Sequence, residues 1–575
     1  MLNNRLLRHI LIWVTVSGFF YPMSVRAQAK STRDTIRQAM KNEMARNLEN
    51  LRLENLHRPF FISYTIRDVK TTTVTAVLGA IVQAEENRYR NHAVRVMVGD
   101  YDLTDENFLD FSGSSYRNTL LQNADELPIE NDYNGIRRAL WIATDNVYKS
   151  ASEQYERKKA AIEQQNISEE TKRLKDFTES PILSHTEVPR IFSADKTGWE
   201  DKAKELSALF KNYYDIYTSQ VRISFYEADV FFINSEGTEI VQPLSLAAVQ
   251  INASTQAVDG EPLTNNASFY GSVPEDIPSL EVMKKAVQST AEELGALRTA
   301  PVFEGSYTGP VLLEGSAVAE LFAQRLFTGT NGLLAHRKPM ASDTRTDSYI
   351  RQTMGETLEE KMNLRILSRD LSIKAMPNLE DFAGEKLIGS YRVDAEGVRI
   401  NSEILLVENG MLRSLLSNRT PTSIIEQSNG HERPIIGGGY LVSSGLGPSV
   451  ISVSTSKGKS MKDMKKALLK LAREEGLDYA VHIRKLKPII TGADLRVDPM
   501  TWLTQGGGRQ RAAELSEPIL VYRVFVKDGR EELVRSVSLG DVTLSALRHI
   551  VSASEQRIVC NTLVPAVSSE EVWFS

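Results

Sequence analysis

The side chains that could bind a metal or act as nucleophiles are few and widely spaced in this sequence. Its 575 residues contain one cysteine, Cys560, and eight histidines, no two of which lie within thirty residues of each other. Zinc hydrolases commonly carry two histidines on one helix, with a glutamate beside them as general base. No local two-histidine motif is present in the sequence, so we do not expect this chain to catalyse metal-assisted hydrolysis alone.

The pair His431–Glu432 in "NGHERP" (429–434) could suggest a zinc hydrolase. Ile436 stands where helical spacing would place the second ligand, and Pro434 interrupts any helix. Glycines follow directly. The pattern therefore favours a turn over a metal-binding helix.

A basic stretch, "AHRKP" (335–339), follows one of the apolar helices described below. One interpretation is a solvated loop. The other is that His336 and Arg337 contact a peptide carboxylate or a partner chain, because a guanidinium forms strong paired hydrogen bonds with a carboxylate. The sequence leaves both interpretations open.

Other patterns that are typical of catalysis indicate structural roles here. "GGGR" (506–509) lacks the Gly-Lys-Ser/Thr of a phosphate-binding loop, and no Gly-x-Ser-x-Gly elbow is present to organise a catalytic triad. In "VDAEGV", Asp394 and Glu396 precede Gly397, where a hairpin needs a turn. We interpret both carboxylates as structural.

Composition and charge exclude some classes of function. Apolar residues make up 41% of the chain and charged residues 25%, as in ordinary globular proteins. The net charge is −6 and no basic cluster alternates with aromatic residues, so nucleic-acid binding is not expected. With one cysteine the chain has no internal disulfide, and Cys560 is expected to be a small buried apolar side chain.

The first 27 residues have the three-part pattern of a secretory signal peptide. A basic start is followed by the apolar run "ILIWVTVSGFF" (10–20), which is too short to span a bilayer, and Val25 and Ala27 suit cleavage before Gln28. An uncleaved N-terminal anchor is the alternative. We expect an exported protein, periplasmic or secreted, with no membrane span after cleavage.

The first half of the sequence alternates helical and strand patterns. We expect helices over 31–56, 135–166 and 279–297, and strands over 59–68, 71–86, 92–102 and 220–261. The long helix carries an apolar stripe, and its charged second half, "YERKKAAIEQQN", is expected to be solvated. "RTAPVFEGSYTGP" (298–310) holds two prolines and two glycines and is the expected domain boundary.

The second half is mostly of strand type. We expect helices over 317–329, 460–476 and 541–554, and strands within 390–417 and 519–539. Ser460 and Asp463 predict the start of one helix and Gly476 its end. In the first of these helices Leu321 and Phe322 belong to an apolar face that is typical of a buried helix.

These patterns predict an α+β protein of two lobes. The N-terminal lobe combines long helices with an antiparallel sheet, and the C-terminal lobe is largely β with a few buried helices. The expected organisation is a signal peptide over 1–27, an N-terminal domain over 28–304 and a C-terminal domain over 305–575.

Several of the stretches together resemble the TldD/PmbA family, whose members were once described as modulators of DNA gyrase and are now regarded as peptidase subunits. The resemblance extends over roughly residues 220–555. It is carried by these segments in order: "NSEGTEI" (234–240), "PVLLEGSAVAELFAQRLFTG" (310–329), "YRVDAEGV" (391–398), "LLVENGMLRSLLSNR" (405–419), "NGHERP" (429–434) and "VFVKDGRE" (524–531).

The resemblance implies a zinc site that this sequence lacks. In metal-bearing members, the helix after the "PV-L" strand carries His-Glu-x-x-x-His, and a later cysteine completes the site. The two histidine positions correspond to Ala323 and Thr328, and the glutamate position to Gln324. Alanine has no donor atom, threonine is a poor zinc ligand and a glutamine amide is no general base. Cys560 follows the closing hairpin, whereas the family's cysteine precedes it.

What remains is similar to the metal-free, PmbA-like (TldE) branch in an exported form. The resemblance implies a TldD-like partner that supplies zinc, and a cavity that admits unfolded peptides. It also implies that the loop with His431 and Arg433 lies near this cavity, which makes both residues candidates for peptide contact. The chain itself is expected to hold no cofactor.

The leading hypothesis is therefore a non-catalytic subunit of a TldD-like zinc peptidase that degrades or processes unfolded peptides. One alternative is a stand-alone exported homodimer that binds peptides or acts as a scaffold. The second alternative is a peptidase that uses residues outside the recognised motifs, whose activity would survive a strong chelator.

Overall fold

The computed structural model describes eleven ranges of the chain. These are residues 21–52, 56–110, 127–164, 173–190, 192, 195–328, 332–354, 357–434, 444–488, 515–565 and 571–574. Within them, no helix is long and apolar enough to cross a membrane. The first twenty residues of the predicted signal peptide lie outside the described residues, and helix α1 begins at Tyr21, before the predicted cleavage point.

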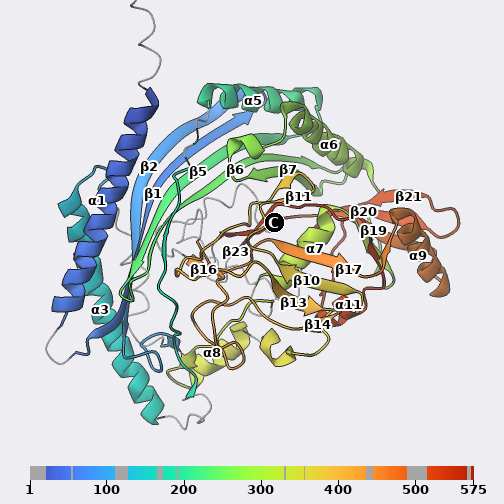
Figure 1. Cartoon of the computed structure of the whole chain (residues 1–575). Coiled ribbons are helices and arrows are strands. Elements are labelled where there is room, and N and C mark those ends of the chain that lie inside the picture. Colours follow the sequence, from blue (N-terminus) through green and yellow to red (C-terminus); the bar gives the residue numbers. More distant parts are fainter. Residues whose placement is uncertain are drawn as a thin grey trace, which may run out of the picture.

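The N-terminal lobe is built on one large, strongly curved sheet (Figure 1). Its strands follow the order β2-β1-β5-β6, with β7 and the short β4 both pairing with β6. All pairs are antiparallel except β4 with β6. The strand bounds are β1 Pro59–Val77, β2 Ala80–Val98, β4 Ser184–Thr186, β5 Thr218–Asn234, β6 Glu239–Gln256 and β7 Pro262–Gly271. Turns that contain Gly237 and Gly260, both with positive φ, separate β5 from β6 and β6 from β7.

Two long strands replace the three short ones that the sequence predicts before residue 103. β1 and β2 pair along almost their whole length and turn at Leu78 and Gly79, both of which have positive φ. The prediction of breaks at 69–70 and 87–91 is wrong. Asn87 and Arg88 lie on the exposed half of the edge strand β2, where polar and charged side chains are tolerated, whereas Arg90 is buried and pairs with Asp68 of β1.

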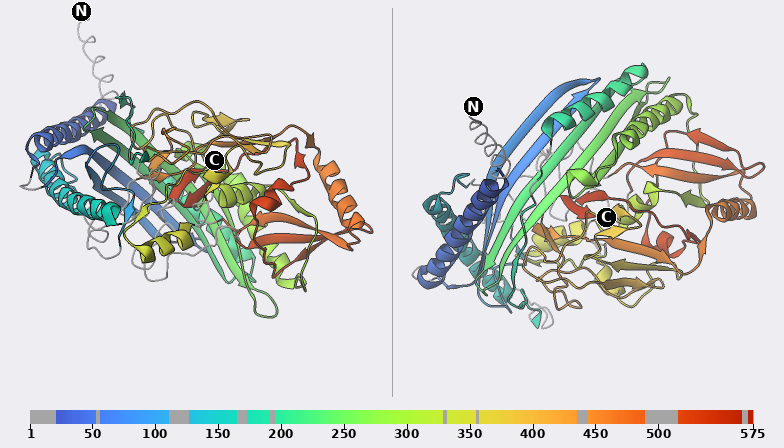
Figure 2. Two further views of the ribbon diagram at one scale, coloured as in Figure 1. Left: turned by 90° about the horizontal axis from the view of Figure 1, so that it is seen from below. Right: turned by 45° about the horizontal axis from the view of Figure 1, so that its top comes forward.

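Four helices cover the outer, convex face of this sheet (Figures 1 and 2). They are α1 Tyr21–Asn50, α3 Tyr133–Gln164, α5 Lys196–Ala208 and α6 Leu280–Thr299. Alternation along β5 explains the two layers. Val221, Phe225 and Phe231 pack under the helices, whereas Tyr226 and Val230 point to the concave face, where the C-terminal lobe sits.

The long helix α3 has the predicted buried stripe, including Ile136, Leu140 and Val147. The prediction that its second half is solvated is wrong at Lys158, whose side chain is buried against Asp176. A lysine is buried only where its charge is paired, and no local pattern in the sequence announces such a distant partner.

The C-terminal lobe consists of short strands and short helices. Two four-stranded sheets, β14-β13-β10-β17 and β21-β20-β19-β8, frame it. Their strands are β8 Val311–Leu313, β10 Leu371–Ala375, β13 Ile404–Glu408, β14 Met411–Leu412, β17 Ile451–Thr455, β19 Tyr479–Leu486, β20 Pro518–Phe525 and β21 Glu531–Val534. The helices are α7 Ser316–Leu326, α8 Thr344–Met354, α9 Met461–Glu474 and α11 Leu544–Arg548.

The remaining strands form two-stranded pairs. They are β3 Phe108–Leu109 with β9 Met340–Ala341, β11 Asp381–Phe382 with β12 Glu385–Lys386, β15 Glu432–Pro434 with β16 Ser444–Leu446, β18 Gly458–Lys459 with β22 Ala553–Ser554, and β23 Thr562–Pro565 with β24 Glu571–Phe574. Three 3₁₀ turns lie at η1 Leu209–Asn212, η2 Pro274–Asp276 and η3 Leu358–Lys361.

The structure confirms the α+β class and most of the helices in the second half. Ser460 caps α9 by accepting the backbone N–H of Asp463, as predicted. The helix predicted over 541–554 is reduced to α11, in which Leu547 alone is buried. Residues 390–401 form no strand, because the Asp394 carboxylate binds backbone N–H groups of its own turn, which competes with strand pairing.

The expected domain boundary lies between α6, which ends at Thr299, and β8, which begins at Val311. A backbone bond from Phe303 N–H to the Arg535 carbonyl ties this connection to the C-terminal lobe. The division at residue 304 stays a prediction.

Candidate functional site

Helix α7 carries Ala323 and Gln324, two of the three positions that the resemblance assigns to a zinc motif, and the third, Thr328, lies two residues beyond its last residue, Leu326. The helix is entered through Gly315, which has positive φ, and every residue from Glu320 to Leu326 is buried. Leu321, Phe322 and Leu326 belong to the main core of the C-terminal lobe, as predicted. Ala323 is completely buried in the same core. The helix is therefore enclosed on all sides, including its polar face.

The polar face of α7 is organised by Gln324. Its Nε2 lies 2.9 Å from Glu320 Oε2, 2.9 Å from Ser516 Oγ and 3.1 Å from the Lys487 carbonyl oxygen. Its Oε1 accepts the backbone N–H of Ser516 at 2.8 Å. The amide thus links α7 to the two chain segments that continue β19 and precede β20. Both ends of the amide are used.

Glu320 is a buried carboxylate with two neutral partners. It accepts hydrogen bonds from Gln324 and, at 2.8 Å, from the Thr562 hydroxyl of β23. Burial raises the pKa of this carboxyl above its ordinary value. A glutamate at position 324 would place a second carboxylate beside the first, which is unfavourable in a buried site. Glutamine therefore fits this position as a structural partner of Glu320.

These side chains do not form a zinc site. Ala323 offers no donor atom, Gln324 is engaged as described, and the Thr328 hydroxyl donates to the Gln324 carbonyl oxygen at 2.5 Å. More broadly, the described residues include no group of three His, Cys, Asp or Glu side chains that could hold a metal ion. The three positions consequently supply packing and hydrogen bonds.

The two candidates from "NGHERP" lie below the surface. His431 is fully buried between Asn429, whose Oδ1 is 2.9 Å from Nδ1, and Ser449, whose Oγ is 3.2 Å from Nε2. Burial lowers the pKa of the imidazole to about 3, so it is neutral. Arg433 lies 3.5 Å over the ring of Tyr391. Their contact with a peptide stays a prediction.

The other candidate pair follows α7. Arg337 crosses to the N-terminal lobe, where its Nη2 lies 2.8 Å from Asp176 Oδ1, and its side chain is 11% exposed. Burial lowers the pKa of His336 to about 4. A freely solvated loop therefore does not describe Arg337. A peptide contact of either residue is likewise untested.

The lobes meet in a network of buried charges near the turn between β5 and β6. The Arg419 guanidinium pairs with both oxygens of Glu236 at 2.8 and 2.6 Å, and its Nε donates to the Thr178 carbonyl. Glu396 accepts from Arg95 at 2.7 Å and from the Arg419 N–H at 2.9 Å. The predicted structural role of Glu396 thus extends to docking of the lobes.

Two more carboxyls lie beside Glu396. Asp394 accepts backbone N–H groups of its own turn and of Glu432, and Glu432 accepts from Asn418 at 2.9 Å. Burial, and next the negative charge of Glu396, raise the pKa of Glu432 to about 7. Burial also raises the pKa of Asp394. This part of the interface therefore retains protons near neutral pH.

Residues 305–472, which include α7, match the family model described as the PmbA/TldA metallopeptidase C-terminal domain. The C-terminal lobe therefore carries a domain of the TldD/PmbA family. The TldD/PmbA family is related to metallopeptidases, and this confirms the resemblance seen in the sequence. The match begins at residue 305, which is also the first residue of the predicted C-terminal domain.

A curated relative and several solved structures agree with this assignment. A protein of Methanothermobacter thermautotrophicus named "Metalloprotease" is 41% identical over 81 residues, which are 14% of this chain and only 16% of that protein.

Three solved structures share the fold. A protein of Thermotoga maritima described as a modulator of a DNA gyrase is 14% identical, with a TM-score of 0.55 over 95% of this chain and 98% of that one. TldE from Thermococcus kodakarensis is 12% identical, with a TM-score of 0.53 over 93% and 98%. A Bacteroides thetaiotaomicron protein described as a modulator of DNA gyrase is 10% identical, with a TM-score of 0.52 over 90% and 93%.

Sequence reasoning missed the interface of charges. Glu236 lies in "NSEGTEI" and Arg419 ends "LLSNR", two of the stretches that resemble the TldD/PmbA family. Both stretches overlap regions whose sequence patterns predict strands. A charged residue inside an apolar strand-turn pattern was the available signal, but its partner is 183 positions away.

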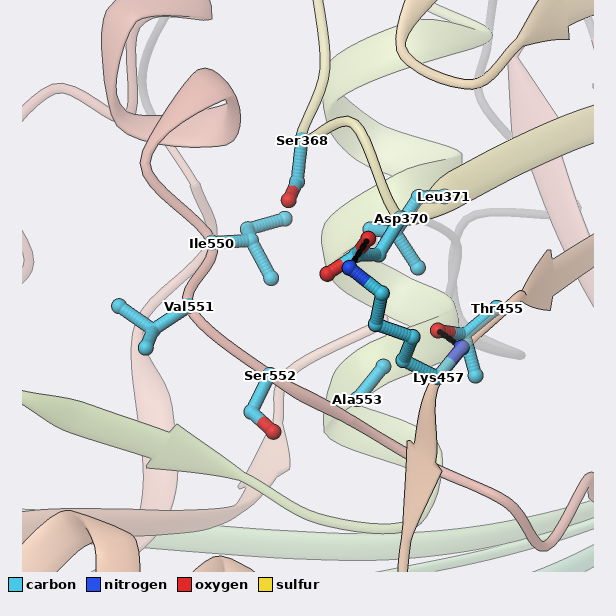
Figure 3. Close-up of a pocket in the computed structure, with 9 residues that line it drawn as sticks. All are labelled: Ser368, Asp370, Leu371, Thr455, Lys457, Ile550, Val551, Ser552 and Ala553. Atoms are coloured by element: carbon cyan, nitrogen blue, oxygen red, sulfur yellow. Dashed lines mark hydrogen bonds and ion pairs between the residues drawn. The ribbon is translucent and has the colours of Figure 1, made fainter.

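A shallow pocket lies at a different place in the C-terminal lobe (Figure 3). Asp370 and Lys457 face each other across it, with 3.2 Å between Oδ1 and Nζ, and Ile550 and Val551 form its apolar side. Its free volume is about 190 Å³, open solvent included. Sites for small ligands usually exceed about 300 Å³. We therefore do not assign this pocket a role in ligand binding.

Proposed function

We propose that this chain is the non-catalytic, metal-free subunit of a TldD-like zinc peptidase that degrades or processes unfolded peptides. The observation that carries the proposal is the state of α7. A helix that resembles the zinc helix of metal-bearing TldD/PmbA proteins, together with the residues just after it, holds Ala323, Gln324 and Thr328 at the ligand and base positions. These side chains pack and form hydrogen bonds within the protein.

Both zinc-ligand positions and the general-base position are replaced together. This supports a subunit with a non-catalytic role over an enzyme that has lost its activity by a single change. Gln324 has acquired its own partners, Glu320 and Ser516, in a closed network. Such a network stabilises the helix and leaves no free donor for a metal. The catalytic zinc would then be supplied by a TldD-like chain, and this chain would complete the chamber that holds the peptide in extended form.

We also propose that the protein is exported, to the periplasm or the medium. Support comes from the basic and apolar pattern of residues 1–20 and the small residues before Gln28. Mass spectrometry of protein isolated from the cell envelope or the medium should find Gln28 as the first residue. An N-terminus that retains residues 1–27 would contradict cleavage.

The decisive experiment is co-expression with a TldD-like chain that has an intact His-Glu-x-x-x-His motif. We expect co-purification, about one zinc ion per TldD-like chain, and peptidase activity that a chelator abolishes. The matched control is this chain purified alone, which should hold no stoichiometric zinc. Zinc that binds to this chain by itself and supports activity would refute the proposal.

Two other outcomes would favour the alternatives. A stable homodimer that binds peptides and ignores the TldD-like chain would indicate a stand-alone binding or scaffold protein. Activity of this chain alone that survives a strong chelator would indicate a peptidase with another catalytic arrangement. Light scattering and a chelator titration separate these cases.

A further inference from the structure

A segment near the C-terminal end lies between the two lobes. Strand β23 lies between the concave face of the large sheet and helix α7 (Figure 1). Residues 560–563, which we call the inner segment, contact the sheet, α7 and the β11–β12 hairpin. The inner segment thus touches both lobes with a few consecutive side chains.

The first contact is made to main chain. The Asn561 amide donates to the Lys386 carbonyl oxygen at 2.8 Å and accepts the Ile388 N–H, with 3.3 Å between the heavy atoms. Lys386 is the last residue of β12 and Ile388 lies in the turn that follows. A carboxamide that binds the C=O and the N–H of residues two positions apart copies one pair of hydrogen bonds of a neighbouring strand. The end of β12 and this turn therefore present main-chain groups to a chain that lies beside them.

The second contact is made to α7. The Thr562 hydroxyl donates to Glu320 Oε1 at 2.8 Å, and both side chains are buried. The other oxygen of Glu320 is held by Gln324. The polar face of α7 therefore presents one oriented acceptor for the inner segment, and Gln324 positions it.

The third contact is apolar and reaches the sheet. Leu563 is 2% exposed and packs in a cluster with Val69, Tyr226 and Tyr270 on the concave face, together with Ile388. The socket is formed by both lobes. Burial of a leucine side chain stabilises such a contact by about 2 kcal/mol.

The chain that leads to the inner segment is loosely held. Residues 555–558 are exposed, and the exposed fraction of Ile558 is 54%. Arg557 is held at the surface by Ser452, 2.6 Å away, and by the ring of Phe382. Segments with few buried contacts open locally at low cost in free energy. The two residues of the inner segment that belong to β23 are buried and pair with β24, so the inner segment leaves its place only where a competing chain supplies the same contacts.

We propose that the inner segment is a tethered occupant of a groove for extended peptides, formed by the end of β12 with the turn after it, Glu320 and the Leu563 socket, and that a free unfolded peptide displaces it. The groove suits a peptide with a carboxamide, a hydroxyl and a large apolar side chain at successive positions. This inference rests on the proposed handling of unfolded peptides and adds the site and the chemistry that it selects.

The single cysteine provides the test in the intact exported chain. Cys560 is half-buried, and burial raises the pKa of its thiol to about 11, so it reacts slowly with thiol reagents while the inner segment is in place. The probe is a synthetic peptide with the sequence of residues 556–565 and the change Cys560→Ser. We expect saturating peptide to accelerate labelling of Cys560 by about tenfold or more, since displacement exposes the thiol.

Matched peptides and variants make the result specific. A peptide that also carries Leu563→Asp should not accelerate labelling, because a charge is excluded from the apolar socket. In the protein, Leu563→Ala should accelerate labelling by about tenfold or more without any peptide, whereas Ile558→Ala, on the exposed part of the same chain, should not. Equal labelling with and without the first peptide, or equal effects of the two variants, would overturn the proposal.

This test is independent of the partner. It requires no zinc, no TldD-like chain and no peptidase activity. A failed co-expression experiment with peptide-dependent labelling would leave the groove intact and refute only the subunit role. An active complex whose Cys560 does not respond to peptide would refute only the groove.

Discussion

Arg419 and Glu236 form a bidentate ion pair across the boundary between the two lobes. The guanidinium is fully buried, and it also lies 4.0 Å from the centre of the Phe177 ring. Glu236 belongs to the turn between β5 and β6, at the end of the curved sheet. The pair therefore holds the concave sheet in a defined position relative to the lobe that contains α7.

Loss of this pair should destabilise the protein strongly. Arg419→Met leaves Glu236 without its partner, and breaking one side of a buried ion pair typically costs about 3 kcal/mol or more. Urea unfolding followed by circular dichroism gives the free energy of unfolding of the variant and the parent.

The matched control is Arg392→Met. Arg392 and Glu380 are 3.3 Å apart, but both side chains are about two-thirds exposed, at 67% and 64%. A surface pair of this kind contributes less than about 1 kcal/mol. Similar losses in the two variants would show that the buried pair does not lock the lobes.

Stability should fall as the pH rises through neutrality because of Glu432. Its pKa is raised to about 7 in the folded protein, chiefly by burial and then by Glu396, and is near 4.5 without these effects. Between these values the folded state holds a proton that the unfolded state has released. The stabilisation is complete below about pH 4.5 and is lost toward pH 7, by roughly 3 kcal/mol in total.

Glu432→Gln tests this proton. Asp394, Glu396 and Arg95 face the carboxyl, and Asn418 donates to it. Glutamine retains a neutral side chain of the same shape at every pH, so the dependence on pH between 5 and 8 should become shallower in urea unfolding. A parent protein whose stability rises over this range would contradict the assignment.

Gln324→Glu should destabilise the protein in a pH-dependent way. The variant places a carboxylate where the amide now lies 2.9 Å from Glu320 and 2.8 Å from the Ser516 N–H. One of the two carboxyls must stay protonated, so its pKa is raised in the folded state and stability is lost as the pH rises through that pKa. We expect a loss of about 2 kcal/mol at pH 7.5 and less at pH 5.

The swapped double variant is the control for this effect. Glu320→Gln with Gln324→Glu restores one carboxylate and one amide on α7 and should recover part of the lost stability. Thermal unfolding at the two pH values measures both variants. If Gln324→Glu alone is as stable as the parent at pH 7.5, an amide at position 324 is not required for stability.

Arg337 should stabilise the folded protein through its ion pair with Asp176. Arg337→Met removes a side chain that is 11% exposed and leaves Asp176 with Lys158 as its remaining cation. We expect a loss of about 2 to 4 kcal/mol in the free energy of unfolding. Lys338→Met, at the exposed neighbouring position, should change it by less than about 0.5 kcal/mol. Equal effects of the two variants would show that Arg337 behaves as a solvated surface residue.

The amino-acid sequence by itself determined the features that depend on residues close together in the chain. The helices α6, α7 and α9, the cap at Ser460 and the turns at Gly237 and Gly260 follow from apolar spacing and turn chemistry within a few positions. The absence of a local two-histidine motif can also be read from the sequence, because it concerns residue types within a few positions of each other.

Only the tertiary structure decided which polar side chains lie together. Arg419 and Glu236 are 183 positions apart, and Thr562 and Glu320 are 242 positions apart. A buried charge or hydroxyl is stable only beside its partner, and that partner is brought by the packing of the lobes and not by any local pattern. For the same reason Lys158 and Arg337, which the sequence allowed to be solvated, became interior links between elements.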